Sequence, residues 1–556
     1  MPASMNEVIE MQTASYLAGI NPASPPTPRT IENELLARVN EQIEIENLQH
    51  HRKNQIPMLK TLTNLMIADV LLRLHHVGRI PMAGENADKD YDIIGIYQAD
   101  GPEAGIYATS DDSIRELARK YHGHLTKNDF TEVMLALRDK APRRSKTMDR
   151  DLIAVNNGVF DFVNKQLLPH SPEFVFTAKS NVDYDANAQD VPITMPDGQQ
   201  WTVEQWVRDL SDDEGVPELI WEIFGAVIRP NVDWNLSASF VSEKGNNGKG
   251  TCIVVMRNLC GPRSHTSIPM TDWGKDFLLE PLVRATAVLV DENDVGTFID
   301  KVANYKAAIT HDVIPINRKF KTPITLRWHG FMVQCFNESP RIKDKSESFY
   351  RRMRIVPFKK SYQGIEREYI KGDYLNRPEV LRYILKRVLH MDYYKLSEPQ
   401  VCADALDEYK VFNDPVRAFW EEFEPRFVWD FVPKAFAYDL YKAWHKAVNP
   451  DGTHLGKTTF LKQLEQVITA TKSPWWSHGK TQVRHKGRMS SPEPLIAEYN
   501  LEAWMNPMAR GSNDPSKKCI PLLANLYTGF SRLGAGHVVL VEDAEDEDDL
   551  DAQDVG

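Results

Sequence analysis

Residues 245–251 read Gly-Asn-Asn-Gly-Lys-Gly-Thr, and they lie between an apolar run that ends at Val241 and a helix-like run from Cys252 to Leu259. Gly261-Pro262 then ends the second run. A strand, a glycine-rich loop and a helix in this order present backbone amides and the helix dipole to a polyphosphate. The sequence therefore predicts a phosphate-binding loop at these seven positions: Gly245, Asn246, Asn247, Gly248, Lys249, Gly250 and Thr251.

Two positions depart from the usual phosphate-loop pattern. Glu243 stands where the pattern has its first glycine, and Gly250 stands where it has serine or threonine. Lys249 is expected to reach the phosphates of ATP, and Thr251 is then the nearest hydroxyl for Mg²⁺. A Gly-Lys pair in an ordinary surface loop is the alternative interpretation.

The length of 556 residues suits three or four domains. No run of 18 apolar residues occurs, and no basic region followed by an apolar one opens the chain. We therefore expect a cytoplasmic protein with no membrane partner. The five cysteines form no CxxC pair with one another or with histidines, so neither a zinc site nor a disulfide framework is expected.

The formal net charge of −12 is concentrated at the end of the chain. The last sixteen residues hold nine acidic residues and no basic one, and without them the charge is −3. Such a tail is typically solvated and disordered, although it also resembles the charge of DNA. Net charge therefore does not argue against a nucleic-acid partner, and local charge has to be considered instead.

Polar residues follow two further strand-like runs. Asp291 and Glu292 come directly after Ala287–Val290, and Asn337 comes directly after Phe331–Phe336. ATP hydrolysis needs one acid for Mg²⁺, a second acid to polarise water and a polar group to orient it. The alternation of strand-like and helix-like runs predicts an α/β core with a largely parallel sheet, which places these groups beside the phosphate loop.

Arginines 351, 352 and 354 precede a last strand-like run. Arginine stabilises charge on a transferring phosphoryl group, and ring ATPases commonly supply it from the neighbouring subunit. Arg352 is the first candidate for this role. Arg351 is the second, because the sequence does not decide which of two adjacent arginines faces the site.

With these elements in order, residues 126–500 resemble the superfamily 3 helicases, specifically the helicase part of phage, plasmid and poxvirus primase-helicases. Asn247-Gly248-Lys249, the acid pair, the asparagine and the Arg-Arg pair before Pro357-Phe358 match in order and approximate spacing. Upstream, residues 152–159 and 168–172 resemble the domain that precedes this ATPase in the family.

The resemblance implies an AAA+-like P-loop ATPase core, a helical and α+β N-terminal region, and a C-terminal winged-helix domain. The expected divisions are a helical segment at 1–85, an α+β domain at 86–200, the ATPase domain at 201–362, a helical linker and winged-helix-like domain at 363–510, and a C-terminal segment with the acidic tail at 511–556. Residues 475–488 interleave tryptophans and histidine with Lys480, Arg484, Lys486 and Arg488, which suits a DNA-contacting wing. The alternative is that the tryptophans are core residues.

In the family, a hairpin between the acid pair and the asparagine projects into a central pore and grips the DNA backbone. Residues 315–323 occupy this place, with Lys319 and Lys321 as the DNA-binding candidates and Arg318 as support. An ordinary surface hairpin is the alternative. Asp312 follows His311 where the family often has glycine, so the geometry of the local turn is not predicted.

These features together favour an ATP-driven DNA helicase that assembles as a ring, expected to be a homo-hexamer, in the replication of a phage or similar mobile element. No primase motif is found before residue 126, so a separate primase or other replication proteins are expected partners. The alternatives are a nucleoprotein remodeller or loader that does not unwind DNA, and an origin-binding protein whose ATP site is only structural.

Overall fold

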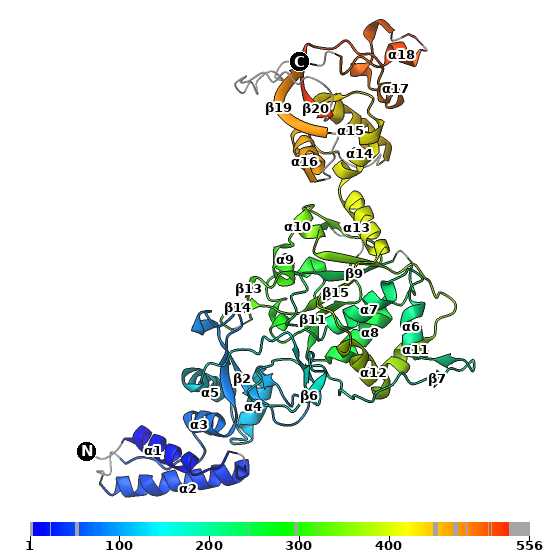
Figure 1. Ribbon diagram of the computed structural model, residues 1–556. Coiled ribbons are helices and arrows are strands. Elements are labelled where there is room, and N and C mark those ends of the chain that lie inside the picture. Colours follow the sequence, from blue (N-terminus) through cyan, green and yellow to red (C-terminus); the bar gives the residue numbers. More distant parts are fainter. Residues whose placement is uncertain are drawn as a thin grey trace. The chain divides into compact units, whose positions relative to one another are not determined.

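The computed structural model describes residues 4–22, 24–49, 55–242, 244–294, 298–319, 321–448, 454–470, 476–484, 487–509, 511–512 and 514–532. Glu243 and the acidic tail therefore lie outside the described residues. The chain forms two compact units, residues 1–406 and 407–556 (Figure 1).

The first unit begins with three helices and a small antiparallel sheet that share one apolar core. In the second helix, Ile31, Leu35, Val39 and Ile43 recur at helical spacing and are all buried. The Thr27 side chain caps this helix and Pro28 is its first residue. The elements are α1 (Met5–Ala18), α2 (Pro28–Asn47), α3 (Asn64–Leu74), β1 (Val77–Ile80), β2 (Ile93–Tyr97), β3 (Tyr107–Ala108), α4 (Asp111–Arg119) and α5 (Lys127–Lys140).

Short antiparallel strands and two helices lead from this region to the phosphate loop. The three-stranded sheet β4-β5-β6 places Ile153, Val155 and Phe160 in the same core as the helices that follow. The elements are β4 (Leu152–Val155), β5 (Gly158–Asp161), β6 (Gln166–Leu168), β7 (Ile193–Thr194), β8 (Gln200–Trp201), α6 (Val203–Asp209) and α7 (Val216–Ala226).

A five-stranded parallel sheet forms the centre of the first unit, as the alternation of strand-like and helix-like runs predicts (Figure 1). Its order is β10-β11-β15-β9-β17, and every neighbouring pair is parallel. The strands are β9 (Ser237–Val241), β10 (His265–Thr266), β11 (Ala287–Val290), β15 (Phe331–Phe336) and β17 (Met353–Pro357). The strand before the phosphate loop is thus flanked by the strand before Asn337 and by the strand that follows Arg351 and Arg352.

Helices α7, α8 (Lys249–Cys260) and α12 (Pro378–Leu389) pack against one another and share the apolar core of the sheet. Residues 374–402 therefore belong to the core of the first unit. The other elements of this unit are β12 (Phe298–Ile299), α9 (Ala303–Ile309), β13 (Val313–Ile316), β14 (Ile324–Arg327), β16 (Arg341–Ile342), α10 (Glu347–Tyr350) and α11 (Glu368–Gly372), and α13 (Gln400–Asn413) crosses into the second unit.

The second unit combines helices with a three-stranded antiparallel sheet of order β18-β20-β19 around an aromatic core. Its elements are α14 (Pro415–Phe423), β18 (Phe431–Pro433), α15 (Lys434–Val448), α16 (Lys457–Ala470), β19 (Trp476–Arg484), α17 (Leu495–Glu498), α18 (Pro515–Lys518) and β20 (Leu526–Arg532).

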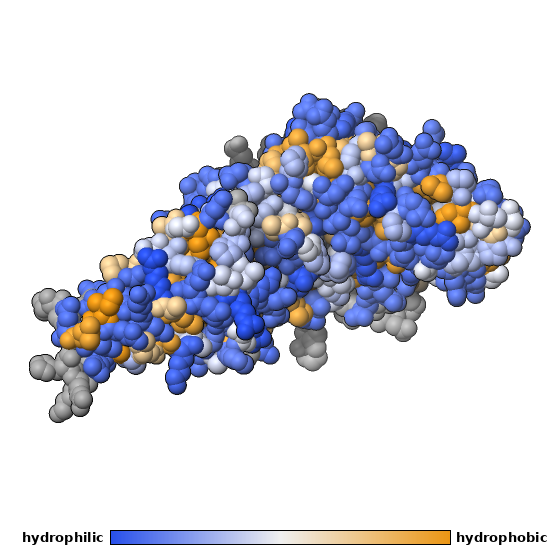
Figure 2. Space-filling view, turned by 90° about the horizontal axis from the view of Figure 1, so that it is seen from below, coloured by the Kyte–Doolittle hydropathy of each residue, from blue (hydrophilic) through white to orange (hydrophobic). Residues whose placement is uncertain are grey.

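Hydrophilic side chains cover most of the face shown in Figure 2, with apolar side chains gathered in small patches. Within the described parts of the chain, none of the helices has the length and apolar character needed to cross a membrane. All five cysteines are buried and none is paired.

Candidate functional site

The turn from the phosphate loop into α8 depends on a glycine at position 248. Gly248 has a φ of +92°, and a Cβ built on it would lie 2.6 Å from Leu210 Cδ2. The φ value favours glycine, because L-residues rarely adopt it, and a larger residue would also push the Leu210 side chain aside. The buried Asn247 side chain accepts a hydrogen bond of 3.2 Å from the Lys249 amide. The loop that the sequence predicts therefore orients the first turn of α8.

A segment that the sequence does not identify holds the exposed part of the loop. The Asn246 side chain donates to Glu366 Oε1 at 2.6 Å, and the Tyr362 amide donates to the Asn246 carbonyl at 2.7 Å. The Tyr362 hydroxyl also donates to the Asp209 carbonyl at 2.8 Å. Residues after the last strand of the sheet thus position the phosphate loop.

Three of the predicted site residues meet at the carboxyl edge of the sheet. Lys249 Nζ lies 3.2 Å from Asn337 Oδ1, and Asn337 Nδ2 lies 3.5 Å from Glu292 Oε1. Lys249 is 5% exposed, and burial lowers its pKa, against the opposing effects of Cys335 and the two acids. The sheet explains this convergence, because parallel strands β9, β15 and β11 end at one edge.

The structure gives a reason for the glycine at position 250. A Cβ built on Gly250 would lie 2.8 Å from Asp291 Oδ1 and 3.4 Å from Lys371 Nζ. The place where the usual pattern has a serine or threonine side chain is therefore filled by the Asp291 carboxylate. Thr251 follows in the first turn of α8.

Two residues of this site are missed by the sequence analysis. Lys371 lies on α11 and brings a second ammonium group to the start of α8. Asn293, which is buried, follows the acid pair and donates to Gln334 Oε1 and the Cys335 carbonyl, both at 3.0 Å. Asn293 thereby ties the end of β11 to β15. The position of Asn293 directly after Glu292 could have identified it from the sequence. Lys371, in contrast, lies in a segment without a recognisable motif.

The two candidate arginines have different surroundings. Arg352 donates through Nη1 to the Ser348 carbonyl and, at 2.6 Å, to Ser348 Oγ, and burial lowers its pKa. Its own carbonyl accepts a hydrogen bond of 2.9 Å from the Ser237 amide. Arg351 is exposed. Arg352 is thus held against its own chain, and Arg351 presents its side chain to solvent.

The expected hairpin is present, since β13 and β14 pair antiparallel with Ile316 opposite Ile324. Arg318 donates through Nε to the Thr322 carbonyl at 3.2 Å, and Lys319 is exposed. Lys321 Nζ forms an ion pair of 2.8 Å with Asp111 at the start of α4. One of the candidate DNA-binding cations is therefore paired with the N-terminal region.

The residue before Asp312 forms the turn at this position. His311, the residue before it, has a φ of +57° and so takes the left-handed conformation that favours glycine. The Asp312 amide donates to the Ala307 carbonyl at 2.9 Å, which closes the C-terminus of α9.

Within residues 475–488, where the sequence suggests a wing, the structure has the strand β19. Arg488, one of the four cations named in this stretch, is only 8% exposed and donates to Ser531 Oγ at 3.1 Å. Trp475 and Lys486 lie outside the described residues.

Known families match three separate parts of the chain. The family "D5 N terminal like" matches residues 62–212, the "Family of unknown function (DUF5906)" matches 240–352, and "Poxvirus D5 protein-like" matches 412–506. No curated protein matches the chain. The two D5 matches confirm the resemblance drawn from the motifs.

Solved structures of the NrS-1 C-terminal region are also similar to this chain. One apo structure, in the A form, is 13% identical over 80% of this chain and 91% of its own, with a TM-score of 0.39. A second, covering residues 305–718 of that protein, is 14% identical over 79% and 92%, with a TM-score of 0.38. Likeness at this level supports no conclusion about activity.

Proposed function

We propose that this chain, which carries the domains of the D5-like family of phage and poxvirus primase-helicases, is an ATP-driven DNA helicase. The observation that carries the proposal is the cluster at the carboxyl edge of the sheet. There Asn337 lies 3.2 Å from Lys249 Nζ through its Oδ1 and 3.5 Å from Glu292 Oε1 through its Nδ2. Basic, amide and acidic groups beside a phosphate loop are the set that nucleotide hydrolysis requires.

Each residue of the cluster has a role in the proposed ATPase. Lys249 binds the terminal phosphates, Glu292 accepts a proton from the attacking water, and Asn337 orients that water. Asp291 and Thr251 are the residues that would hold Mg²⁺, which neutralises charge on the phosphates when bound. The donor set fits, because the Asp291 carboxylate already occupies the place of the missing side chain at Gly250. The amides of the α8 N-terminus complete the phosphate site.

We place this ATPase in a homo-hexameric ring of the AAA+ type, with ATP between subunits. An arginine from the neighbouring subunit then reaches the phosphates. The exposure of Arg351 and the Ser348 bonds of Arg352 support Arg351 as the group that crosses the interface and Arg352 as the group that positions it.

The DNA strand passes along the β13–β14 hairpins in this proposal. Lys319 and Lys321, supported by Arg318, contact phosphates without reading bases. The second unit acts as a winged-helix domain near the fork, in support of replication together with a separate primase.

Hydrolysis by the Lys249→Ala variant tests the nucleotide site. We expect a loss of at least about 100-fold in ATP turnover, because an electrostatic contact to the transferred group is removed. Lys244→Ala is the matched control, since Lys244 is an exposed lysine in the same loop, and it is expected to hydrolyse ATP normally. Turnover retained by Lys249→Ala would reject the assignment. Turnover without strand separation would instead favour a remodeller or loader.

A further inference from the structure

Three side chains with no role in the proposed ATP site converge at the base of the β13–β14 hairpin. Asp233 precedes β9, His311 follows α9, and His329 lies between β14 and β15. One nitrogen or oxygen atom from each lies within 4.8 Å of the others. Two imidazoles and a carboxylate form a donor set that zinc sites use.

His311 is oriented as a metal-binding histidine is. It is 7% exposed, and its Nδ1–H donates to the Trp328 carbonyl at 2.9 Å. This bond leaves the Nε2 lone pair available, and Nε2 lies 3.9 Å from Asp233 Oδ1. Histidines that bind metals commonly donate their second ring nitrogen to a carbonyl in this way, which fixes the tautomer. Among the described residues, Nε2 has no hydrogen-bond partner despite its burial.

The backbone of His311 sets the direction of its side chain. Its φ of +57° lies at the helix C-terminus, a position that favours glycine. Here the conformation places the imidazole beside Asp233 and His329.

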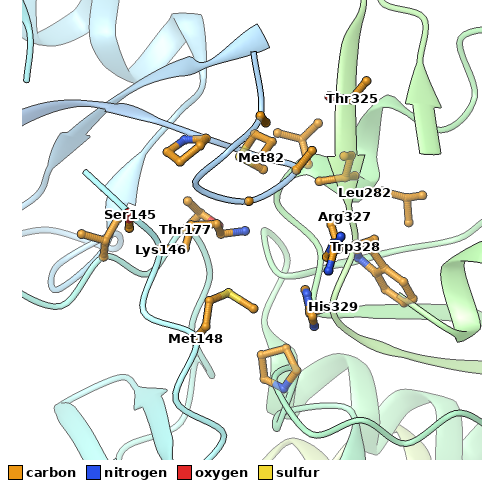
Figure 3. Close-up of a pocket in the computed structure, with 18 of the residues that line it drawn as sticks. Met82, Ser145, Lys146, Met148, Thr177, Leu282, Thr325, Arg327, Trp328 and His329 are labelled. Atoms are coloured by element: carbon orange, nitrogen blue, oxygen red, sulfur yellow. The ribbon is translucent and has the colours of Figure 1, made fainter. Parts of the chain in front are cut away.

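His329 completes the cluster from the other side. Its ring stacks on that of His311 with centroids 4.7 Å apart and planes inclined by 13°. Its Nδ1 is buried and, within the described part of the chain, has no hydrogen-bond partner. Figure 3 shows His329 on one wall of a pocket of about 800 Å³, beside Arg327 and across from Lys146. Two buried ring nitrogens without partners in one cluster need an explanation.

We propose that Asp233, His311 and His329 bind a divalent transition-metal ion of the zinc type. Ligand atoms at tetrahedral zinc lie about 3.3 Å apart, given bonds of roughly 2.0–2.1 Å. Metal binding therefore requires Asp233, whose side chain is 75% exposed, to rotate toward His311, and the His329 ring to tilt out of the stack. Lys146 and Arg327 line the same pocket as His329, which favours an anionic fourth ligand. The ion would fasten the base of the hairpin to the loop before β9.

Zinc titration of the full chain tests the site, with excess Mg²⁺ present and a chromogenic chelator as competitor. We expect wild-type protein to bind one more Zn²⁺ per chain than Asp233→Asn or His329→Gln, or to bind it at least about 10-fold more tightly. Asp312→Asn is the matched control, because Asp312 is an exposed acid next to His311, and it should behave as wild type. Co²⁺ should give visible absorption of the tetrahedral kind, lost in Asp233→Asn.

Equal Zn²⁺ stoichiometry and affinity in wild type, Asp233→Asn and His329→Gln would overturn the proposal, as would the absence of Zn²⁺ binding in wild type. The exposed position of Asp233 keeps the test valid if a histidine variant fails to fold. The metal-free thermal midpoint of Asp233→Asn should equal that of wild type, and only wild type should gain stability with Zn²⁺.

Discussion

The carboxyl edge of the five-stranded sheet and the β13–β14 hairpin lie in one unit but are built differently. At the sheet edge, Asp291 and Asn337 directly follow adjacent parallel strands, so the backbone places them. At the hairpin, the His311 side chain donates to the Trp328 carbonyl across the base, and Lys321 is paired with Asp111 of another element. Chemistry at a strand end is encoded locally, whereas contacts among loops depend on the folded chain. In our account the first region turns over ATP and the second engages DNA, so their effects should separate.

Glu292→Gln should separate ATP turnover from DNA binding most clearly. Without a proton acceptor for the attacking water, ATP turnover should fall by roughly 100-fold or more, while DNA binding in the presence of ATP should persist. Turnover and DNA binding measured on one preparation check this. Glu338→Gln, an exposed acid beside Asn337, is the control and should hydrolyse ATP normally. Normal turnover in Glu292→Gln would assign the proton acceptor elsewhere.

Gly250→Ala tests whether ATP turnover depends on the position of the Asp291 carboxylate at the sheet edge. Its Cβ would stand 2.8 Å from Asp291 Oδ1, so the carboxylate has to move. We expect ATP turnover to fall by about 10-fold to 100-fold, without loss of folding, because alanine favours a helix by about 1 kcal/mol over glycine. Gly123→Ala is the control, since Gly123 lies outside the phosphate loop and nothing lies within 4 Å of its Cβ position. Unchanged turnover in Gly250→Ala would mean that Asp291 needs no fixed position.

Replacement of Lys319 and Lys321 by alanine should affect only the second region. Basal ATP turnover should remain, while stimulation by single-stranded DNA weakens and the salt dependence of DNA binding falls by about 2 in slope. Steady-state hydrolysis with and without DNA, at several salt concentrations, measures both. Unchanged stimulation would exclude the hairpin from DNA binding.

Asp111→Asn should have the smallest effect of these variants, and it should strengthen DNA binding rather than weaken it. It frees Lys321 from an ion pair that is partly exposed on both sides, so DNA affinity should rise by about 2-fold to 5-fold. Asp112→Asn, its exposed neighbour, is the control and should leave DNA affinity unchanged. Weaker DNA binding in Asp111→Asn would show that the pair holds the hairpin in its working position.

Much of the sheet edge is predictable from sequence because its residues follow apolar runs directly. The strands before Lys249, Asp291 and Asn337, and the hairpin with its cations, are present where the sequence predicts them. Gly250 is a departure from a pattern in the sequence, and only the position of the Asp291 carboxylate explains it.

Contacts between distant segments could not be predicted. Glu366 reaches Asn246 across 120 residues, and Lys371 reaches the start of α8 from a five-residue helix without a motif. Asp233, His311 and His329 are too far apart in the sequence to form a recognisable motif. The spacing of the cysteines does not indicate zinc either. The burial of Arg488 likewise depends on packing against β20 rather than on local charge.

Strand displacement on a forked DNA duplex tests the central claim most directly, because it needs both regions at once. Wild type and Lys244→Ala should release the displaced strand only with ATP and Mg²⁺, and Lys249→Ala should release none. Release of the strand by Lys249→Ala, or ATP hydrolysis by wild type without any release, would contradict the account.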